Sequence, residues 1–129
     1  MEHRTVVTVL DAPKERVFAY LAEIDNLPRW ATEFARELRY ENRKAKVVNG
    51  LGEFFFEIRA DRKTGVIDMY AGPTEDALAL FPGRVVGLPG DRSAYSFTMF
   101  QGPEMPDELF ESQHASLKRE LANLERELS

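Results

Sequence analysis

The feature that most constrains the fold is a long apolar stripe near the end of the chain. Beyond Pro106, whose fixed φ suits a first helical turn, apolar positions recur at spacings of four and three residues. The stripe consists of Phe110, His114, Leu117, Leu121, Leu124 and Leu128. This period predicts one amphipathic helix of roughly five turns or more, running to the end of the chain. Its opposite side is charged, so only one face should be buried.

The middle of the chain predicts strands, because no helical period interrupts residues 34–101. We expect strands near residues 34–41, 43–48, 53–60, 65–71, 77–87 and 92–101, separated by turns rich in Gly, Pro, Asn and Asp. Pro82 and Gly83 fall inside one of these segments. Proline cannot donate to a strand ladder, so this point predicts a bulge or bend. An antiparallel meander is the expected arrangement.

The first thirty residues predict one more strand and two short helices. Residues 5–10 (TVVTVL) have strand composition, Asp11 and Pro13 suit the start of a helix, and Pro28 suits a second helix at residues 27–31. The inner face of a seven-stranded sheet needs a cover, and only the C-terminal helix is long enough. The sequence therefore predicts an α+β fold, a curved antiparallel seven-stranded sheet around that helix. A coiled-coil dimer through the same stripe is the alternative.

Composition narrows the function. The 129 residues predict one domain over residues 1–129, and their net charge of −5, without a basic stripe, argues against a nucleic-acid partner. The chain has no cysteine, no apolar run of the ~20 residues that span a bilayer and no apolar leader, so we expect a cytoplasmic protein without membrane insertion. The sequence has no spacing of residues typical of metal ligands and no phosphate-binding loop. We therefore expect neither a metal nor another cofactor. Both a monomer and a homodimer stay open.

Several segments resemble a known superfamily. Residues 12–21 (APKERVFAYL), 26–30 (NLPRW) and 64–68 (TGVID), with residues 84–86, 95–101 and 106–108 near the end, are similar to SRPBCC proteins of the polyketide cyclase/dehydrase-like family. The resemblance covers essentially the whole chain. It implies the START-like helix-grip fold, with a ligand cavity between the sheet and the long helix, and it implies no particular reaction, since members include carriers, receptors and cyclases.

The residues expected to line such a cavity are aromatic and apolar positions of the strands and helices. They are Trp30, Phe54, Phe56, Tyr70, Tyr95, Phe97, Phe110, His114, Leu117 and Leu121. The assignment depends on strand phase, because a one-residue slip turns every side chain to the other face. The alternative for each of these residues is ordinary core packing, since protein interiors normally close to high density.

Two polar residues are candidates for catalysis. His114 stands where the stripe calls for leucine, and a histidine there could move a proton, bind a ligand or simply be a satisfied core residue. Asp68 lies within a predicted strand between Val66 and Tyr70. Turned inward it could form an acid/base pair with His114; in the other phase, which we favour, it faces solvent and Ile67 and Met69 face the core.

These observations leave three hypotheses. The first is the binding of a small hydrophobic or aromatic ligand, of lipid, polyketide or isoprenoid type, without a reaction. The second is a small cyclase, dehydratase or isomerase that uses His114 and Asp68. The third is an interaction protein with a filled core. The sequence favours the binding protein over an enzyme, because no spacing typical of catalysis is present.

Overall fold

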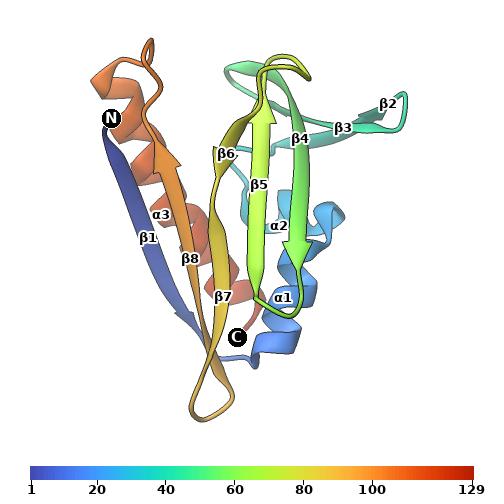
Figure 1. Cartoon of the computed structure of the whole chain (residues 1–129), viewed down its shortest axis with the longest axis vertical. Helices are drawn as coiled ribbons and strands as arrows, with labels where there is room; N and C mark the ends of the chain where they lie inside the picture. Colours follow the sequence, from blue (N-terminus) through green and yellow to red (C-terminus); the bar gives the residue numbers. More distant parts are fainter.

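The computed structural model describes residues 1–129, which form one antiparallel sheet and a long helix across its inner face (Figure 1). The strands are β1 (His3–Leu10), β2 (Glu37–Glu41), β3 (Lys44–Asn49), β4 (Gly52–Asp61), β5 (Val66–Gly72), β6 (Ala79–Phe81), β7 (Gly83–Leu88) and β8 (Arg92–Phe100). Their order across the sheet is β1-β8-β7-β5-β4-β3-β2, and β6 pairs with β5 beside this path. The first and last strands are therefore neighbours.

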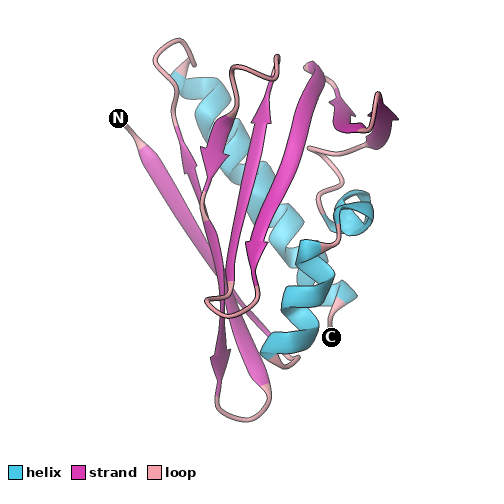
Figure 2. Ribbon diagram, turned by 45° about the vertical axis from the view of Figure 1, so that its right-hand side comes forward, coloured by secondary structure: helices cyan, strands magenta, loops and turns pink.

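The helices follow the predicted order. They are α1 (Lys14–Ala22), the 3-10 turn η1 (Ile24–Asn26), α2 (Leu27–Trp30) and α3 (Asp107–Glu127). Figure 2 shows α3 running diagonally behind the sheet, with the short helices beside its C-terminal half. The stripe packs within the chain, because Phe110, Leu117 and Leu124 all belong to the buried core. The predicted α+β architecture is confirmed, and the stripe is not free to form a coiled coil.

Two strand predictions need correction. The segment expected at residues 34–41 becomes a strand only at Glu37, because the backbone N–H groups of Glu33 and Phe34 bond to a side chain of α3 instead of a neighbouring strand. The segment expected at residues 77–87 is two strands, β6 and β7, so the sheet has eight strands.

The bend predicted at Pro82 and Gly83 is confirmed and separates β6 from β7. Pro82 has no N–H to donate, and its carbonyl accepts a hydrogen bond of 2.9 Å from the amide of Thr98. A Cβ on Gly83 would lie 2.6 Å from the carbonyl oxygen of Ile67. Only glycine allows the backbones to approach this closely.

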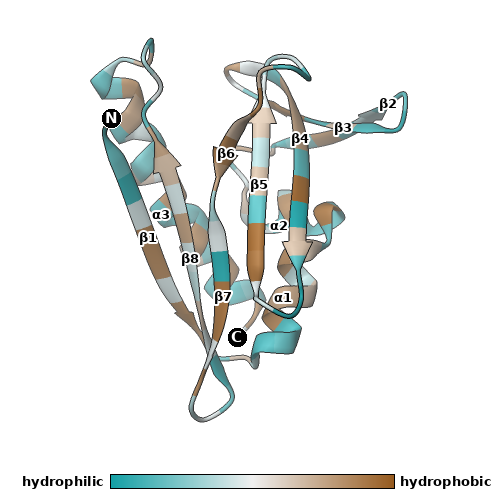
Figure 3. Ribbon diagram, viewed as in Figure 1, coloured by the Kyte–Doolittle hydropathy of each residue, from teal (hydrophilic) through white to brown (hydrophobic).

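Strand phase decides which side chains reach the interior. On β5 the buried residues are Ile67, Met69 and Ala71, so Asp68 and Tyr70 point to the outer face. This is the phase that the sequence favoured for Asp68. Figure 3 shows the corresponding alternation of apolar and polar bands along β4 and β5. No helix combines the length and the apolar character that a bilayer crossing requires.

Candidate functional site

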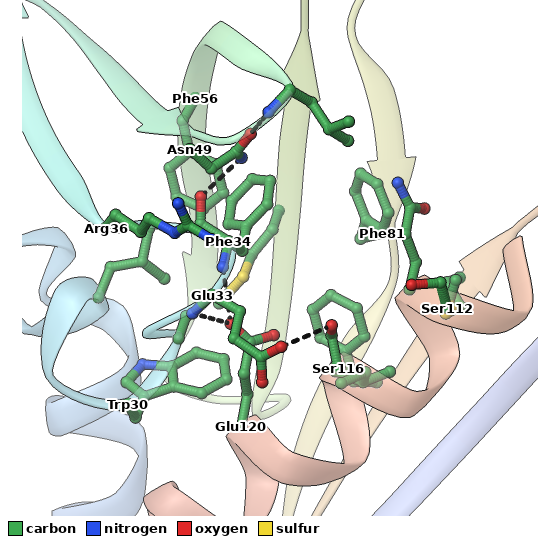
Figure 4. A pocket seen from close by; sticks show the side chains of 18 of the residues that line it. Trp30, Glu33, Phe34, Arg36, Asn49, Phe56, Phe81, Ser112, Ser116 and Glu120 are labelled. Atoms are coloured by element: carbon green, nitrogen blue, oxygen red, sulfur yellow. Dashed lines mark hydrogen bonds between the residues drawn. The ribbon is translucent and has the colours of Figure 1, made fainter. Parts of the chain in front are cut away.

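A cavity of about 460 Å³ lies between the sheet, the middle of α3 and the segment around α2 (Figure 4). Apolar side chains from four strands, two helices and the segment after α2 form most of its wall. They include Trp30, Phe34, Phe56, Met69, Phe81, Phe97, Met99 and Leu117. Two aromatic pairs shape this wall: the rings of Phe34 and Phe56 are 5.7 Å apart, and those of Phe81 and Phe97 stack at 5.8 Å. The wall of the space is therefore mostly apolar and aromatic.

One side of the cavity is polar, and it belongs to α3. Ser112, Gln113, Ser116 and Glu120 lie along the flank of the apolar stripe and all line the space. Ser112, Ser116 and Glu120 recur four residues apart, and Gln113 is next to Ser112, which places all four on one side of the helix. A ligand in the cavity would thus meet an apolar sheet on one side and hydrogen-bonding groups on the other.

Glu120 is the buried carboxyl of the site, with only 5% of its surface exposed. Its Oε2 accepts hydrogen bonds from the backbone amides of Glu33 (3.1 Å) and Phe34 (2.9 Å). Burial raises the pKa of Glu120 to about 7, although these two hydrogen bonds act in the opposite direction. The carboxyl can therefore exchange a proton near neutral pH.

The mouth of the cavity is closed on one side by an ion pair between α3 and the segment after α2. Glu33 receives two hydrogen bonds from Arg119, of 2.7 and 2.9 Å, and one of 2.9 Å from Ser116. The hydrogen bonds from the Arg119 guanidinium lower the pKa of Glu33 below its usual value. Asn49 of β3 also contacts the segment after α2, because its side-chain amide donates a hydrogen bond of 2.8 Å to the carbonyl of Phe34. The segment at residues 31–36 is thereby tied to both α3 and β3.

Comparison with solved structures identifies the architecture. The structure matches XoxI from Bacillus cereus with a TM-score of 0.77 over 99% of this chain and 96% of that chain, at 16% identity. A START superfamily protein from Mycobacterium smegmatis matches with a TM-score of 0.69 over 98% and 96% of the two chains, at 12% identity. The ZhuI aromatase/cyclase from Streptomyces sp. R1128 matches at 0.65 over 97% and 89%, at 18% identity.

The chain has the START-like helix-grip fold. Polyketide aromatase/cyclases share this fold, as the sequence resemblance implied. No family model matches the sequence, and a search of curated proteins finds no match either. The likeness therefore defines the fold, and the chemistry must be argued from the site.

The helix-grip fold brings four of the expected cavity residues to the cavity. Trp30, Phe56, Phe97 and Leu117 line it, and their contact with a ligand stays a prediction. Four further candidates lie elsewhere in the interior. Tyr95, Phe110 and Leu121 are fully buried in the core, and Phe54 is half-buried against it. These four residues support the wall without lining it.

Tyr70 corrects the prediction most clearly. It lies on the outer face of the helix-grip sheet, where the guanidinium of Arg59 sits 4.3 Å from the centre of its ring. The prediction required the strand phase that turns Asp68 and Tyr70 inward. On β5 the buried side chains are instead those of Ile67, Met69 and Ala71. Tyr70 therefore does not line the cavity.

The structure does not bring His114 and Asp68 together. His114 does not line the cavity, and its Nδ1 lies 3.9 Å from Oε2 of Glu111 on the same helix. Asp68 lies on the opposite, outer face of the sheet. No three His, Asp or Glu side chains are grouped so that they could hold a metal ion.

Glu120 is the residue that sequence reasoning missed. The sequence predicts an apolar stripe and a charged opposite side, and neither prediction includes Glu120. A signal was present, because Gln113, Ser116 and Glu120 repeat the helical period directly beside Leu117. Distinguishing this row from a solvated face required the position of residues 31–36, whose amides bond to Glu120.

Tyr95 supports the cavity wall and offers a stability test. It is fully buried, its ring packs edge-on against Trp30, and its hydroxyl has no hydrogen-bond partner. A buried hydroxyl without a partner is costly. We expect Tyr95→Phe to raise the free energy of unfolding by about 1 kcal/mol in urea denaturation. Tyr40→Phe, which removes a hydroxyl bonded to Asp25, should bring no gain; an equal gain in both variants would contradict this account.

Proposed function

We propose that the protein binds a small hydrophobic or aromatic molecule in the cavity between the sheet and α3. The cavity itself carries the proposal: about 460 Å³, with a wall that is mostly apolar and aromatic. Small-molecule sites typically have volumes of roughly 300–1,000 Å³ and such a lining. Ligands of lipid, polyketide or isoprenoid type fit this description.

A substitution that fills the cavity tests the proposal. Ser116 lines the space, so Ser116→Trp places an indole where the ligand would lie. We expect this variant to bind the neutral fluorescent probe N-phenyl-1-naphthylamine at least about tenfold more weakly than the wild type, which corresponds to 1.4 kcal/mol. Fluorescence titration gives both dissociation constants.

The neighbouring residue provides the matched control. Ala115 is exposed on the same helix and does not line the cavity, so Ala115→Trp adds the same side chain outside it. This variant should bind the probe as the wild type does. Equal affinities for all three proteins would mean that the probe binds elsewhere. The absence of binding by the wild type to a panel of apolar probes would favour the interaction protein instead.

A second candidate function is acid/base catalysis, now with Glu120 in place of His114 and Asp68. The supporting observation is a buried carboxyl at the cavity whose pKa is raised to about 7, near the optimum for a group that both accepts and gives up protons. A small cyclase, dehydratase or isomerase would use such a group. Mass spectrometry of a bound ligand before and after incubation separates the two functions, because a carrier returns its ligand unchanged and Glu120→Gln abolishes turnover by an enzyme.

A further inference from the structure

The two oxygens of the Glu120 carboxyl have different surroundings. Oε2 is held by the amides of Glu33 and Phe34, whereas Oε1 takes part in no hydrogen bond. Oε1 is also not sealed off, because the hydroxyls of Tyr20 and Tyr95 are the only enclosed side-chain polar atoms without a partner. Since Glu120 lines the cavity, Oε1 is open to whatever occupies it (Figure 4).

In the other carboxyl at the cavity, that of Glu33, both oxygens already accept hydrogen bonds. Oε1 of Glu33 accepts from Ser116 and Arg119, and Oε2 accepts from Arg119 as well. The two carboxyls therefore have different functions at the mouth. Glu33 closes the contact between α3 and the segment at residues 31–36, and Glu120 keeps one acceptor free on the ligand side.

The position of Glu120 is fixed from both ends. Its backbone belongs to α3, and the two amides hold its carboxyl from the segment after α2. Leu117, Leu121 and Leu124 of the same helix are buried in the core on either side of Glu120. An acceptor that is already oriented loses little entropy when a donor binds to it.

We infer that Glu120 Oε1 is the polar anchor of the ligand, and that the site selects an apolar molecule carrying a neutral hydrogen-bond donor, such as a phenolic or enolic hydroxyl. This inference rests on the proposed function. A ligand carboxylate would meet a second carboxylate in an apolar space, and a ligand ammonium would lose its hydration among aromatic side chains while Arg36 lines the same mouth. A hydroxyl costs less to desolvate than a charged group and gains a bond to a charged acceptor.

Matched naphthalene probes test the selection at pH 8. 2-Naphthol and 2-methoxynaphthalene have the same ring and the same oxygen, but only the naphthol can donate. We expect the wild type to bind 2-naphthol about tenfold more tightly than the methyl ether, because a hydrogen bond to a charged group contributes about 1.5–3 kcal/mol. 2-Naphthoate and 2-naphthylmethylamine should both bind more weakly than 2-naphthol. Isothermal titration gives the four dissociation constants.

Two variants assign the preference to one carboxyl. In Glu120→Gln the amide oxygen can still accept from residues 33 and 34, which leaves an N–H₂ donor facing the cavity. The preference for 2-naphthol should then fall to within twofold or reverse. Glu111→Gln alters a carboxyl of the same helix that lies outside the cavity and bonds to Arg4, so its preference should stay near tenfold.

The pH dependence of the preference for 2-naphthol tests the role of Glu120 in the wild type, without a variant. As the pH falls from 8 to 5.5, Glu120 takes up a proton, loses its charge and becomes a donor, so the preference for 2-naphthol should decline. The charged groups near Glu120 are Glu33, Arg36 and Arg119; the pKa of Glu33 is lowered by its bonds to Arg119, and a guanidinium is always protonated in proteins. The strands contribute no titratable residue to the lining. This measurement decides the question if Glu120→Gln does not fold.

The outcomes separate the inference from the proposed function. If the naphthol and the ether bind equally well to the wild type, or if the amine or the naphthoate binds best, the inference is overturned and the cavity is still a binding site. The same holds if Glu111→Gln loses the preference as Glu120→Gln does. If none of the four probes binds, both the inference and the proposed function fail.

Discussion

Glu120→Gln should stabilise the protein by about 3 kcal/mol at pH 8.5 and by almost nothing at pH 4.5. The pKa of Glu120 rises from 4.5 to about 7 on folding, mainly through burial. At 1.36 kcal/mol per unit of pKa, the ionised carboxyl disfavours the folded state by about 3 kcal/mol. The folded wild type binds the extra proton, so its stability is full below pH 4.5 and is lost as the pH rises through about 7. Glutamine has no charge to bury and avoids this loss.

Urea denaturation at several pH values between 4.5 and 8.5 measures the effect, and Glu33→Gln is its control. The pKa of Glu33 is lowered in the folded protein, so its contribution is lost only as the pH falls below the usual range of a glutamate. The difference between Glu33→Gln and the wild type should therefore change little from pH 5.5 to 8.5. A difference between Glu120→Gln and the wild type that is independent of pH would show that Glu120 is well solvated, contrary to the structure.

Leu124→Ala should lower the free energy of unfolding by about 3–5 kcal/mol, because it removes a side chain that is enclosed on all sides. Leu124 is fully buried in the core beneath the sheet. Leucine-to-alanine substitutions at such positions lose the transfer free energy of the removed groups and the contacts around the new void. Denaturation in urea at a constant pH measures the difference.

Leu117→Ala provides the comparison, since it makes the same chemical change on the same helix. Leu117 is also buried, but its side chain lines the cavity and already lacks neighbours on one side. We expect a loss of only about 2 kcal/mol, close to the transfer free energy alone. Equal losses at both positions would indicate that the space beside Leu117 is filled in solution.

The architecture was largely predictable because it follows from local periods. The stripe on α3 predicted one long helix with one buried face. Pro82 has no backbone N–H to donate to a strand ladder, which predicted the bend that separates β6 from β7. The start of β2 was not predictable. Residues 34–36 precede the strand without any helical period, but the amide of Phe34 bonds to Glu120, 86 residues further along the chain. No local pattern contains that partner.

The site was harder to predict, because strand phase and the edges of a helical stripe depend on tertiary contacts. Trp30, Phe56 and Phe97 were expected at the cavity and do line it, whereas Tyr70 required a phase that the core excludes. The candidate pair His114 and Asp68 combined residues on opposite sides of the sheet. Glu120 was overlooked because a charged residue beside a stripe is usually solvated, and its burial depends on the segment at residues 31–36.

The break between β6 and β7 also divides the sheet into two parts along the cavity. β7 joins β5 at a single residue pair, Val66 with Arg84, while β6 pairs with β5 over three residues. Where β6 passes β8, the hydrogen bond from Thr98 to Pro82 and the stacked rings of Phe81 and Phe97 form the junction. The strand ladders there do not depend on these two rings. Substitutions at Phe81 and Phe97 can therefore change the shape of the cavity while the backbone pairing is kept. Related chains can then differ in the shape of their cavities and still share the fold.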